Sequence, residues 1–508
     1  MLAQKLIVNY GSKLAMQFLQ IAAGIIVARI AGPTILGTVA FGVAFVSMFE
    51  FLGDLGTGPA HMKLISEGRD LASCISTFLV MKVFLSGFFC FAVFAFYFFQ
   101  KYVMQIEFES SIHERVIFIM LASVTIQQLL GIPKLTFAAR TEQAKYNVPD
   151  VIRVTLTVIL RVIVILLGFG AVALASSNLI ATLFIVPVTL YLFRGYPMSH
   201  FDTAIAKQYV RISLPVILMG MSTSLIYYLD KIIVQYYFGS QFVGIYSAGY
   251  RIGGLVLMIA TSAGVIFLPL FSNAVSKNNL KYLQATVRRF ERFSLLFVMP
   301  VVLFLAIYAD VIINVVLGQQ YLPSIPIMSV INIAMFLMML NLPYGNVLTG
   351  MGHFRLTAII NFLALCFFTA LIIMLPNPKY LNLGLIGVAI AVLLSNVFIG
   401  SLYRYFAKRK CPIIDLQHGV KFVLFGLGNF IVFQVTYTHF SDTLGVAFKL
   451  AFIPLYFAVT YSVLVGLGWL RKQDIADLRE LINIRKLGRY VQEEIRCRDM
   501  DVPDRPDF

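Results

Sequence analysis

The stretch "GIIVARIAGPTILGTVAFGVAF", from Gly24 to Phe45, decides the fold because the chain repeats it. A second stretch, "KIIVQYYFGSQFVGIYSAGYRI" from Lys231 to Ile252, aligns with the first without a gap after a shift of 207 residues. Six of 22 positions are then identical. The identical pairs are Ile25/Ile232, Ile26/Ile233, Val27/Val234, Gly32/Gly239, Gly37/Gly244 and Gly42/Gly249. This repetition predicts two structurally related halves.

Composition indicates that lipid surrounds the folded chain. The 508 residues are 59% hydrophobic and 13% charged, and the mean hydropathy is +0.86. A soluble domain contains about a quarter charged residues, so this chain has too little polar surface to cover a water-soluble globule of its size. The five cysteines are scattered without a pairing pattern or a metal-ligand spacing, and no metal site is expected.

Apolar runs of roughly 17–25 residues between short polar breaks predict membrane-spanning helices. The first six spans are expected near 14–31, 36–56, 72–99, 116–138, 148–170 and 173–193. The next six are expected near 209–237, 242–270, 293–316, 326–349, 356–376 and 383–406. The last two are expected near 420–438 and 444–469. The predicted fold class is therefore an all-α polytopic membrane protein with 14 transmembrane helices.

Basic residues in the expected loops indicate the orientation. Loops after even-numbered spans carry 18 Lys and Arg residues, whereas loops after odd-numbered spans carry three: Lys101, Arg115 and Lys379. Because basic loops stay on the cytoplasmic side, both termini are expected in the cytoplasm. The formal charge of +16 is then mostly an orientation signal and does not indicate a nucleic-acid partner.

The repeat and the span count together predict the domain organisation. Six spans separate the two copies, so both copies point the same way, and two parallel six-helix lobes should be related by a pseudo-twofold axis. We expect an N-terminal lobe at 1–195, a second lobe at 196–410, two extra helices at 411–470 and a cytoplasmic amphipathic tail at 471–508. The paired glycines are expected at tight outer turns and close helix contacts.

Several charges lie where a membrane protein should have none. A charge at the bilayer centre costs about 2.5–3.5 kcal/mol on insertion scales. Arg161, Arg251 and Lys82 lie too deep to reach the interface, and the acidic residues are too few to neutralise all three. A cationic cavity for an anion, phosphate first, is the simplest explanation. Structural ion pairs between helices remain the alternative for any single residue.

The acidic residues inside the spans are Glu50 and Asp54 in the second, Asp230 in the seventh and Asp310 in the ninth. Asp230 directly precedes Lys231, so a local pair is one alternative. Because neighbours along a helix do not share a face, we expect each to have a different partner. All six histidines fall in loops or at span ends. Coupling to protons or sodium would therefore depend on Glu50, Asp54 or Asp230, and no other cofactor is expected.

Four segments in order resemble a known family. "SLPVILMGMSTSLIYYLDKIIVQYYFGSQFVGIYSAGYRI" and "ARIAGPTILGTVAFGVAFVSMFEFLGDLGTG" resemble the second-half and first-half signatures of polysaccharide flippases. "VLGQQYLPSIPIM" resembles the family's turn after the ninth span, and "LTGMGHFR" resembles its inner turn after the tenth. The resemblance covers essentially residues 1–440 and is to the Wzx-type O-antigen and oligosaccharide-lipid flippases of the multidrug/oligosaccharidyl-lipid/polysaccharide exporter superfamily.

The resemblance implies a V-shaped, alternating-access transporter rather than an enzyme. It implies that the substrate is an undecaprenyl-pyrophosphate-linked oligosaccharide, flipped across the bacterial inner membrane, with the lipid bilayer and other polysaccharide assembly proteins as partners. Lipid II flippases of the superfamily place an arginine on the first span, where this chain has Arg29. The expected substrate-binding residues of the cationic cavity are Arg29, Lys82, Arg161, Lys231 and Arg251.

Three other functions remain open from the sequence, one of which is a purely structural partner in an assembly complex that docks through the amphipathic tail. A cation-coupled multidrug exporter of the same superfamily would require an acidic cavity, whereas the residues counted here are basic. A membrane polysaccharide polymerase or ligase would usually need a large outer loop, whereas the longest outer connection, near 100–115, is short. No nucleophile–base arrangement is recognisable, so no catalytic residue is expected.

Overall fold

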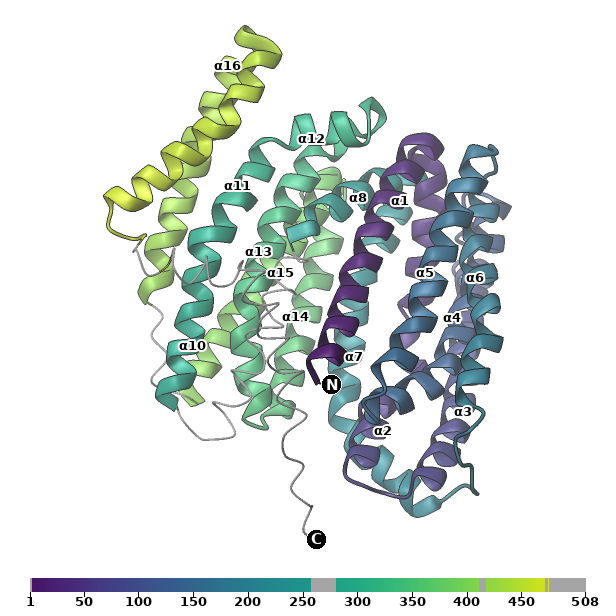
Figure 1. The fold of residues 1–508 in the computed structure, drawn as a ribbon. Coiled ribbons are helices and arrows are strands. Elements are labelled where there is room, and N and C mark those ends of the chain that lie inside the picture. The colour runs from purple at the N-terminus through teal and green to yellow at the C-terminus, as the bar shows by residue number, and fades with distance from the viewer. Residues whose placement is uncertain (1, 257–279, 411–416, 471–473, 475–508) are drawn as a thin grey trace.

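The computed structural model describes residues 2–256, 280–410, 417–470 and 474. Within these ranges the chain is helical and contains no strand, and Figure 1 shows its long helices standing side by side. Nine helices in the described part are long and apolar enough to cross a membrane. The predicted all-α membrane fold is confirmed.

The helices of the first half follow the six predicted spans. They are α1 (Leu2–Ser47), η1 (Glu50–Gly53), α2 (Thr57–Ser66), α3 (Leu71–Phe98), η2 (Phe99–Val103), α4 (Ser111–Ala139), α5 (Gln143–Leu166) and α6 (Ala171–Phe193). The uncharged break expected between the fifth and sixth spans is a turn with Gly168 at φ +76°. A glycine is favoured in this left-handed conformation because it has no β-carbon.

The second half has a similar order. It contains α7 (Thr203–Phe238), α8 (Ser240–Gly253), α10 (Leu280–Phe293), η3 (Ser294–Val298), α11 (Met299–Ile307), α12 (Ala309–Val316), η4 (Gln319–Ser324), α13 (Ile325–Gly350), α14 (Phe354–Met374) and α15 (Gly384–Lys410). The rest of the eighth predicted span, to residue 270, lies outside the described residues.

The two copies of the repeat make the same turn. In the first copy, α1 kinks at Gly32, whose backbone angles are φ 75° and ψ 171°. In the second, Gly239 separates α7 from α8 with φ 84° and ψ 178°. These angles are strained for any residue with a β-carbon, so glycine is required at both positions. Each turn joins two helices that run back on each other at one end of the molecule (Figure 1).

The repeated glycines also bring the two halves into contact. A β-carbon at Gly37 would overlap the backbone of Ser240 and lie 2.7 Å from the backbone nitrogen of Gly244. A β-carbon at Gly244 would overlap the carbonyl group of Pro33. Gly37 and Gly244 are equivalent positions of the repeat, so they meet where the axis between the halves must pass. This contact closes the end of the molecule at which both turns lie.

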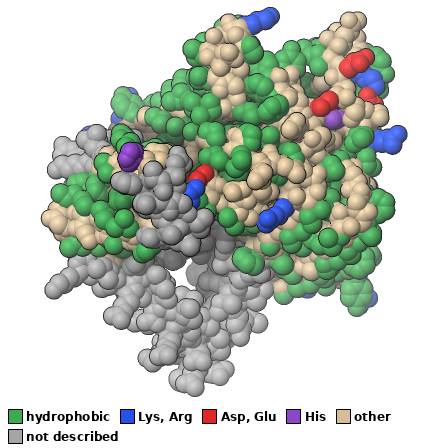
Figure 2. Space-filling model, turned by 90° about the horizontal axis from the view of Figure 1, so that it is seen from above, with side chains coloured by type: hydrophobic (Ala, Val, Ile, Leu, Met, Phe, Trp, Pro, Cys, Tyr) green, Lys and Arg blue, Asp and Glu red, His purple; other side chains and the backbone are tan. Residues whose placement is uncertain are grey.

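A polar contact reinforces the closed end. The carboxylate of Glu109, between η2 and α4, accepts hydrogen bonds from the backbone N–H of Ser240 (2.8 Å), from its hydroxyl, and from the amide of Gln235 (2.9 Å). His113 lies 2.6 Å from the Ser240 hydroxyl. Seen from this end, the surface is mostly hydrophobic or uncharged, with few charged side chains (Figure 2). We call Glu109, Gln235 and Ser240 the outer latch, where "outer" refers to the orientation expected from the basic loops.

The second predicted span, 36–56, is not a continuous helix, and the prediction is wrong for its C-terminal part. The helix ends at Ser47, passes through the short turn η1, and resumes as α2 from Thr57. The break coincides with left-handed conformations at Leu55 (φ 43°) and Gly56 (φ 76°). Glu50 and Asp54 therefore lie in a break of the second span rather than on a continuous helix.

The last two predicted spans lie in α16 (Gln417–Gly466). The hydroxyl of Tyr456 donates a hydrogen bond to Asn429 over 3.2 Å, and the rings of Tyr437 and Phe452 lie 5.3 Å apart. In a straight helix, residues 429 and 456 would be about 40 Å apart, so the segment doubles back on itself. The predicted tail at 471–508 lies outside the described residues, except Asp474.

Candidate functional site

A pocket of about 520 Å³ lies between the two halves, below the closed end. Helices α1, α5, α6, α7, α8 and α13 all contribute to its wall. Its polar lining residues are Gln17, Gln20, Arg161, Tyr227, Tyr228, Lys231, Ser247, Tyr250 and Arg251. The described lining residues include no aspartate and no glutamate, so the charged side chains on its wall are all positive. The positive charge of the pocket wall favours an anionic ligand.

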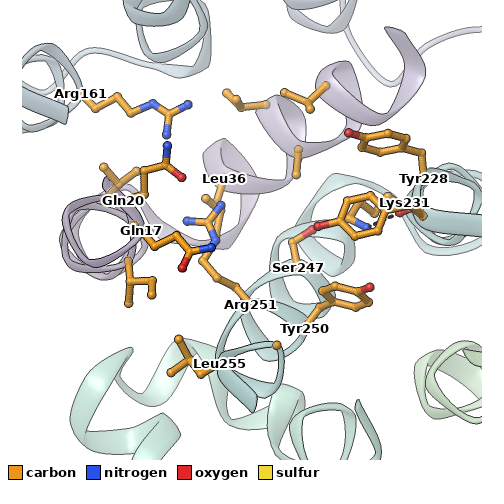
Figure 3. A pocket seen from close by; sticks show the side chains of 18 of the residues that line it. Gln17, Gln20, Leu36, Arg161, Tyr228, Lys231, Ser247, Tyr250, Arg251 and Leu255 are labelled. Atoms are coloured by element: carbon orange, nitrogen blue, oxygen red, sulfur yellow. Dashed lines mark hydrogen bonds between the residues drawn. The ribbon is translucent and has the colours of Figure 1, made fainter. Parts of the chain in front are cut away.

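Arg251 extends from α8 toward α1. Its guanidinium carbon lies 3.4 Å from the position that a β-carbon of Gly24 would occupy, so the side chain rests on the bare backbone of α1. In the described part of the chain, this guanidinium makes no ion pair and no hydrogen bond. In Figure 3 it lies beside Gln17. Arg251, which the sequence predicts to bind substrate, therefore lies in the pocket wall, and its role in binding stays a prediction.

Arg161 approaches the same pocket from α5. One guanidinium nitrogen donates to the side-chain oxygen of Asn178 over 3.0 Å, while its Nε is buried without a partner in the described part of the chain. Figure 3 shows the guanidinium group pointing toward Gln20 and the pocket. A buried N–H group without a partner costs about 1–3 kcal/mol. A ligand that accepts hydrogen bonds here would remove that cost.

Lys231 lies in the pocket wall but differs from the arginines. Its Nζ lies 3.0 Å from Asp230 and donates to the carbonyl of Tyr227, also over 3.0 Å. The expectation that Asp230 and Lys231 would have different partners is wrong. The flexible lysine stem folds back along the helix, under the rings of Tyr227 and Tyr250, and brings the ammonium group to its neighbour. The hydroxyl of Tyr246 also donates to Asp230, over 2.9 Å.

Two predicted cavity residues are not in this pocket. Lys82 is 3% exposed, forms an ion pair with Asp54 and donates to the carbonyl of Gly53 over 3.1 Å. The ammonium group of Lys82 therefore stabilises the break in the second span. The expectation that Lys82 had no acidic partner is wrong, because Asp54 lies next to it in the fold. Arg29 donates to the carbonyl of Val315 over 3.1 Å, which links α1 to the end of α12.

The three candidates for ion coupling are also in different situations. Asp54 is paired with Lys82, and Asp230 is paired with Lys231. Glu50 makes no side-chain hydrogen bond or ion pair among the described residues, although Asp54 and Lys82 are close enough to act on its charge. Of the three, Glu50 is the carboxylate still available to exchange a proton or an ion.

The other basic residues predicted inside spans have carboxylate partners. Lys134 lies 2.8 Å from Asp150, and Arg153 lies 4.0 Å from the same residue. Lys449 lies 3.1 Å from Asp310. The structural ion pairs kept as an alternative are therefore real for most of this set. Arg161 and Arg251 differ from them because no carboxylate neutralises either one in the described chain.

Some lining residues were not predicted from the sequence. Gln17, Gln20, Tyr227, Tyr228 and Tyr250 face the pocket. Uncharged polar residues are common in the spans, so their identity alone gave no signal. The repeat did contain a signal for one of these residues. Tyr250 is equivalent to Val43, as Lys231 is to Gly24, and all four positions line the same pocket.

Comparison with solved structures places the fold. An inward closed structure of the lipid II flippase MurJ superposes with a TM-score of 0.72 at 14% identity, covering 91% of this chain and 99% of that one. An inward-facing MATE family multidrug transporter of the MOP superfamily superposes with a TM-score of 0.63 at 16% sequence identity. The match covers 78% of this chain and 95% of that one. A third structure is a MOP superfamily transporter from Pyrococcus furiosus, described as having a binding pocket of reverse polarity. It superposes with a TM-score of 0.56 at 15% sequence identity, and the match covers 81% of this chain and 95% of that one. At these identities the likeness shows a shared fold.

Sequence comparison extends this result. An uncharacterized membrane protein of Methanocaldococcus jannaschii is 29% identical over 176 residues, which is 34% of this chain and about a third of that relative. A family model described as polysaccharide biosynthesis protein matches residues 26–326, which is more than half of the chain and includes the second copy of the repeat and all but the first two residues of the first. The chain therefore belongs to this polysaccharide biosynthesis protein family and has the membrane fold of the MOP superfamily.

Proposed function

We propose that this protein flips a polyprenyl-pyrophosphate-linked oligosaccharide across the membrane by alternating access. The observation that carries the proposal is the presence of two guanidinium groups, on Arg161 and Arg251, that face one pocket without a carboxylate partner among the described residues. Guanidinium groups bind phosphate oxygens through paired hydrogen bonds. A diphosphate between them would neutralise the wall and satisfy the buried Nε of Arg161.

The physical task of such a flippase is to replace water around the phosphates and sugars. Hydrocarbon offers no hydrogen bonds, so the head group cannot cross it unaided. The pocket would offer Arg161, Arg251 and Lys231 to the diphosphate, and the nearby amides and tyrosines to the sugars. The polyprenyl tail can stay in lipid throughout, because only the polar head must pass between the halves.

The closed end supports the direction of access. The Gly37–Gly244 contact and the outer latch shut one end of the molecule. The pocket would therefore load from the opposite end. Separation of the two repeat turns would then expose the head group to the other side. With the orientation given by the basic loops, loading would occur from the cytoplasm, and we place the protein in the bacterial inner membrane with both termini cytoplasmic.

The main rival is a cation-coupled drug exporter of the same superfamily. A cationic drug would be repelled by Arg161 and Arg251 on the wall of this pocket, whereas the charge of Lys231 is balanced by Asp230. A polymerase or ligase would need a nucleophile beside a base. The described lining residues contain no histidine, cysteine or carboxylate that could serve as either. The electrostatics of the pocket therefore favour transport of an anionic head group.

The driving force is proposed to act through Glu50. It is the candidate without a side-chain partner among the described residues, and it lies in the break of the second span. Broken helices in secondary transporters commonly bind the coupling ion. Replacement by glutamine should reduce the dependence of transport on a proton or sodium gradient without weakening the binding of undecaprenyl pyrophosphate.

The test compares two arginines of one helix. Arg161→Gln removes a guanidinium group from the pocket, whereas Arg153→Gln removes one that lies near Asp150 and does not line it. Purified variants would be titrated with undecaprenyl pyrophosphate, and with tetraphenylphosphonium as the cationic probe. Loss of one charge-assisted hydrogen bond should weaken pyrophosphate binding about tenfold to hundredfold in Arg161→Gln and leave Arg153→Gln near wild type.

Transport would be measured in a host that lacks its own flippase, as accumulation of lipid-linked oligosaccharide. Arg161→Gln and Arg251→Gln should both cause accumulation at normal protein levels. Wild-type pyrophosphate affinity in both variants, or tight tetraphenylphosphonium binding to the wild type, would remove the anion site and favour the drug exporter.

A further inference from the structure

A second cavity, of about 630 Å³, lies at the end of the molecule opposite the outer latch. It forms where the turn between α13 and α14 meets the last turn of α15. Its lining includes His353, Phe354, Arg355, Phe406, Arg409 and Lys410. The proposed transport cycle uses none of these residues. The cavity includes part of the "LTGMGHFR" turn that the sequence marked without assigning it a role.

No carboxylate in the described part of the chain neutralises the cations of this cavity. Arg355, Arg409 and Lys410 make no ion pair and no side-chain hydrogen bond with described residues. On the same helix, Arg404 lies 3.7 Å from Glu291, so a carboxylate partner is provided for a cation only six residues away from Lys410. All three side chains are exposed, so water screens their mutual repulsion, and an anion that entered the cavity would be attracted by all three.

The backbone adds to the positive potential. Helix α14 begins at Phe354 and runs for 21 residues, and the side chain of its N-cap residue, His353, forms no capping hydrogen bond. The first N–H groups of a helix lack partners within the helix and favour anions. Because residues 353–356 line the cavity, this helix end and the three cationic side chains act on the same space.

Exposed apolar side chains lie on α14 beyond the cavity. Ile359, Phe362 and Leu363 share one face of the helix, whereas Phe354 lines the cavity on another side of it; all four are between 40% and 52% exposed. In a helix that crosses a membrane, such a face meets acyl chains. A cationic cavity at the end of an apolar, lipid-facing helix matches a molecule with an anionic head and apolar chains.

We propose that this cavity binds the head group of an anionic phospholipid, whose acyl chains lie along α14. Basic pockets at the ends of membrane helices attract anionic lipid head groups, at about 1 kcal/mol for each Lys or Arg near the surface. The volume falls within the roughly 300–1,000 Å³ of small-molecule sites and accommodates a phosphoglycerol head group. The ligand is a resident lipid and is distinct from the transported head group.

The experiment counts bound lipids by native mass spectrometry. The full-length protein is exchanged from nanodiscs of phosphatidylglycerol and phosphatidylcholine, as wild type and as Arg355→Gln/Arg409→Gln. The matched control, Lys207→Gln/Lys408→Gln, removes two exposed basic residues that do not line the cavity. We expect the cavity variant to lose phosphatidylglycerol affinity about thirtyfold. The control should keep it, and phosphatidylcholine binding should not change in either.

Three outcomes would overturn the proposal. Equal losses in the cavity variant and the control would mean diffuse attraction to the surface. Full displacement of phosphatidylglycerol by millimolar inorganic phosphate would mean a site for the free anion instead of a lipid. Retained affinity in the cavity variant would exclude the site. If the double variant is unstable in detergent, Lys410→Gln is measured in its place, with Lys408→Gln as its control, and is expected to lose about fivefold.

Discussion

The two copies of the repeat share a backbone but differ in chemistry. Both turn at a glycine with almost the same angles, and both place equivalent positions on the wall of one pocket. In the first copy these positions are small or apolar, and in the second they are cationic, polar or aromatic. The pairs are Gly24/Lys231, Ala40/Ser247 and Val43/Tyr250.

This difference shows which features a duplicated membrane fold must retain. Glycines at Gly32, Gly37, Gly239 and Gly244 are fixed by turn geometry and by close backbone contact, where a β-carbon does not fit. Side chains that face the pocket are not fixed by the turn geometry, so they can differ between the two copies while the backbone stays the same. An asymmetric cation site can therefore form between two symmetric halves, and Arg251 extends across the axis to the bare backbone of Gly24.

The largest loss of stability should come from breaking the Asp230–Lys231 ion pair, which has no counterpart in the first copy. Asp230 is 1% exposed, and Lys231→Gln would leave its carboxylate without a cationic partner. Breaking a buried pair on one side costs about 3–5 kcal/mol. We expect a loss of this order in the free energy of unfolding in detergent. The double variant Asp230→Asn/Lys231→Gln should recover most of the lost stability, because it removes both charges. A double variant no more stable than Lys231→Gln alone would mean that Asp230 is not charged.

The next effect concerns the contact at which equivalent glycines meet. Gly37→Ala would force the backbones at Ser240 and Gly244 apart and open the closed end, at a cost of about 1–3 kcal/mol. The control is Gly87→Ala, a helical glycine with no atom within 4 Å of the new β-carbon, which should be neutral or stabilising. Thermal unfolding measures the cost, and equal melting temperatures for both variants would contradict the close contact.

Most of the fold could be predicted because its causes are local in sequence. Apolar run length and the period of 207 residues gave the helices, their order and the two related halves. The break after Ser47 was missed because hydropathy does not report backbone angles, and the left-handed conformation of Leu55 has no compositional signal. The doubling back of α16 was predicted as two spans, since the apolar runs on either side are each long enough to cross.

The site was harder to predict because it depends on pairing in three dimensions. Depth and charge singled out Arg161 and Arg251, and both face the pocket. The same argument failed for Lys82, because Asp54 lies 28 residues away in sequence yet reaches it through the break in the second span. A count of charges gives the excess of cations, but only the folded positions show which cations remain unpaired.

A third prediction would supply the carboxylate that the first copy lacks. Gly24→Asp places an acidic group against the guanidinium of Arg251, whose flexible end can move to accept it. The new ion pair would neutralise Arg251, one of the two guanidinium groups of the pocket, so undecaprenyl pyrophosphate should bind at least about tenfold more weakly. Gly24→Asn has nearly the same size without the charge and is the control. Similar affinities in the two variants would show that Arg251 does not bind the diphosphate.

The smallest expected effect is at the outer latch, where the first half supplies the carboxylate and the second supplies the donors. Partial burial alone would raise the pKa of Glu109, but hydrogen bonds from Ser240 and Gln235 outweigh it and hold this pKa below the ordinary value of 4.5. A lowered pKa means that the contact stabilises the closed end at neutral pH, and that this contribution is lost as the pH falls through the lowered value.

Because Glu109 is partly exposed, solvent screening limits its contribution to about a few tenths of a kcal/mol. Glu109→Gln should therefore open the closed end slightly at pH 7 and make less difference as the pH falls through the lowered pKa of Glu109, as measured by the distance between spin labels on the two repeat turns. His113 lies 3.9 Å from the carboxylate, so His113→Gln serves as the background in which to measure the change. Equal spin-label distances at pH 7 with and without Glu109→Gln would show that the glycine contact alone keeps this end shut.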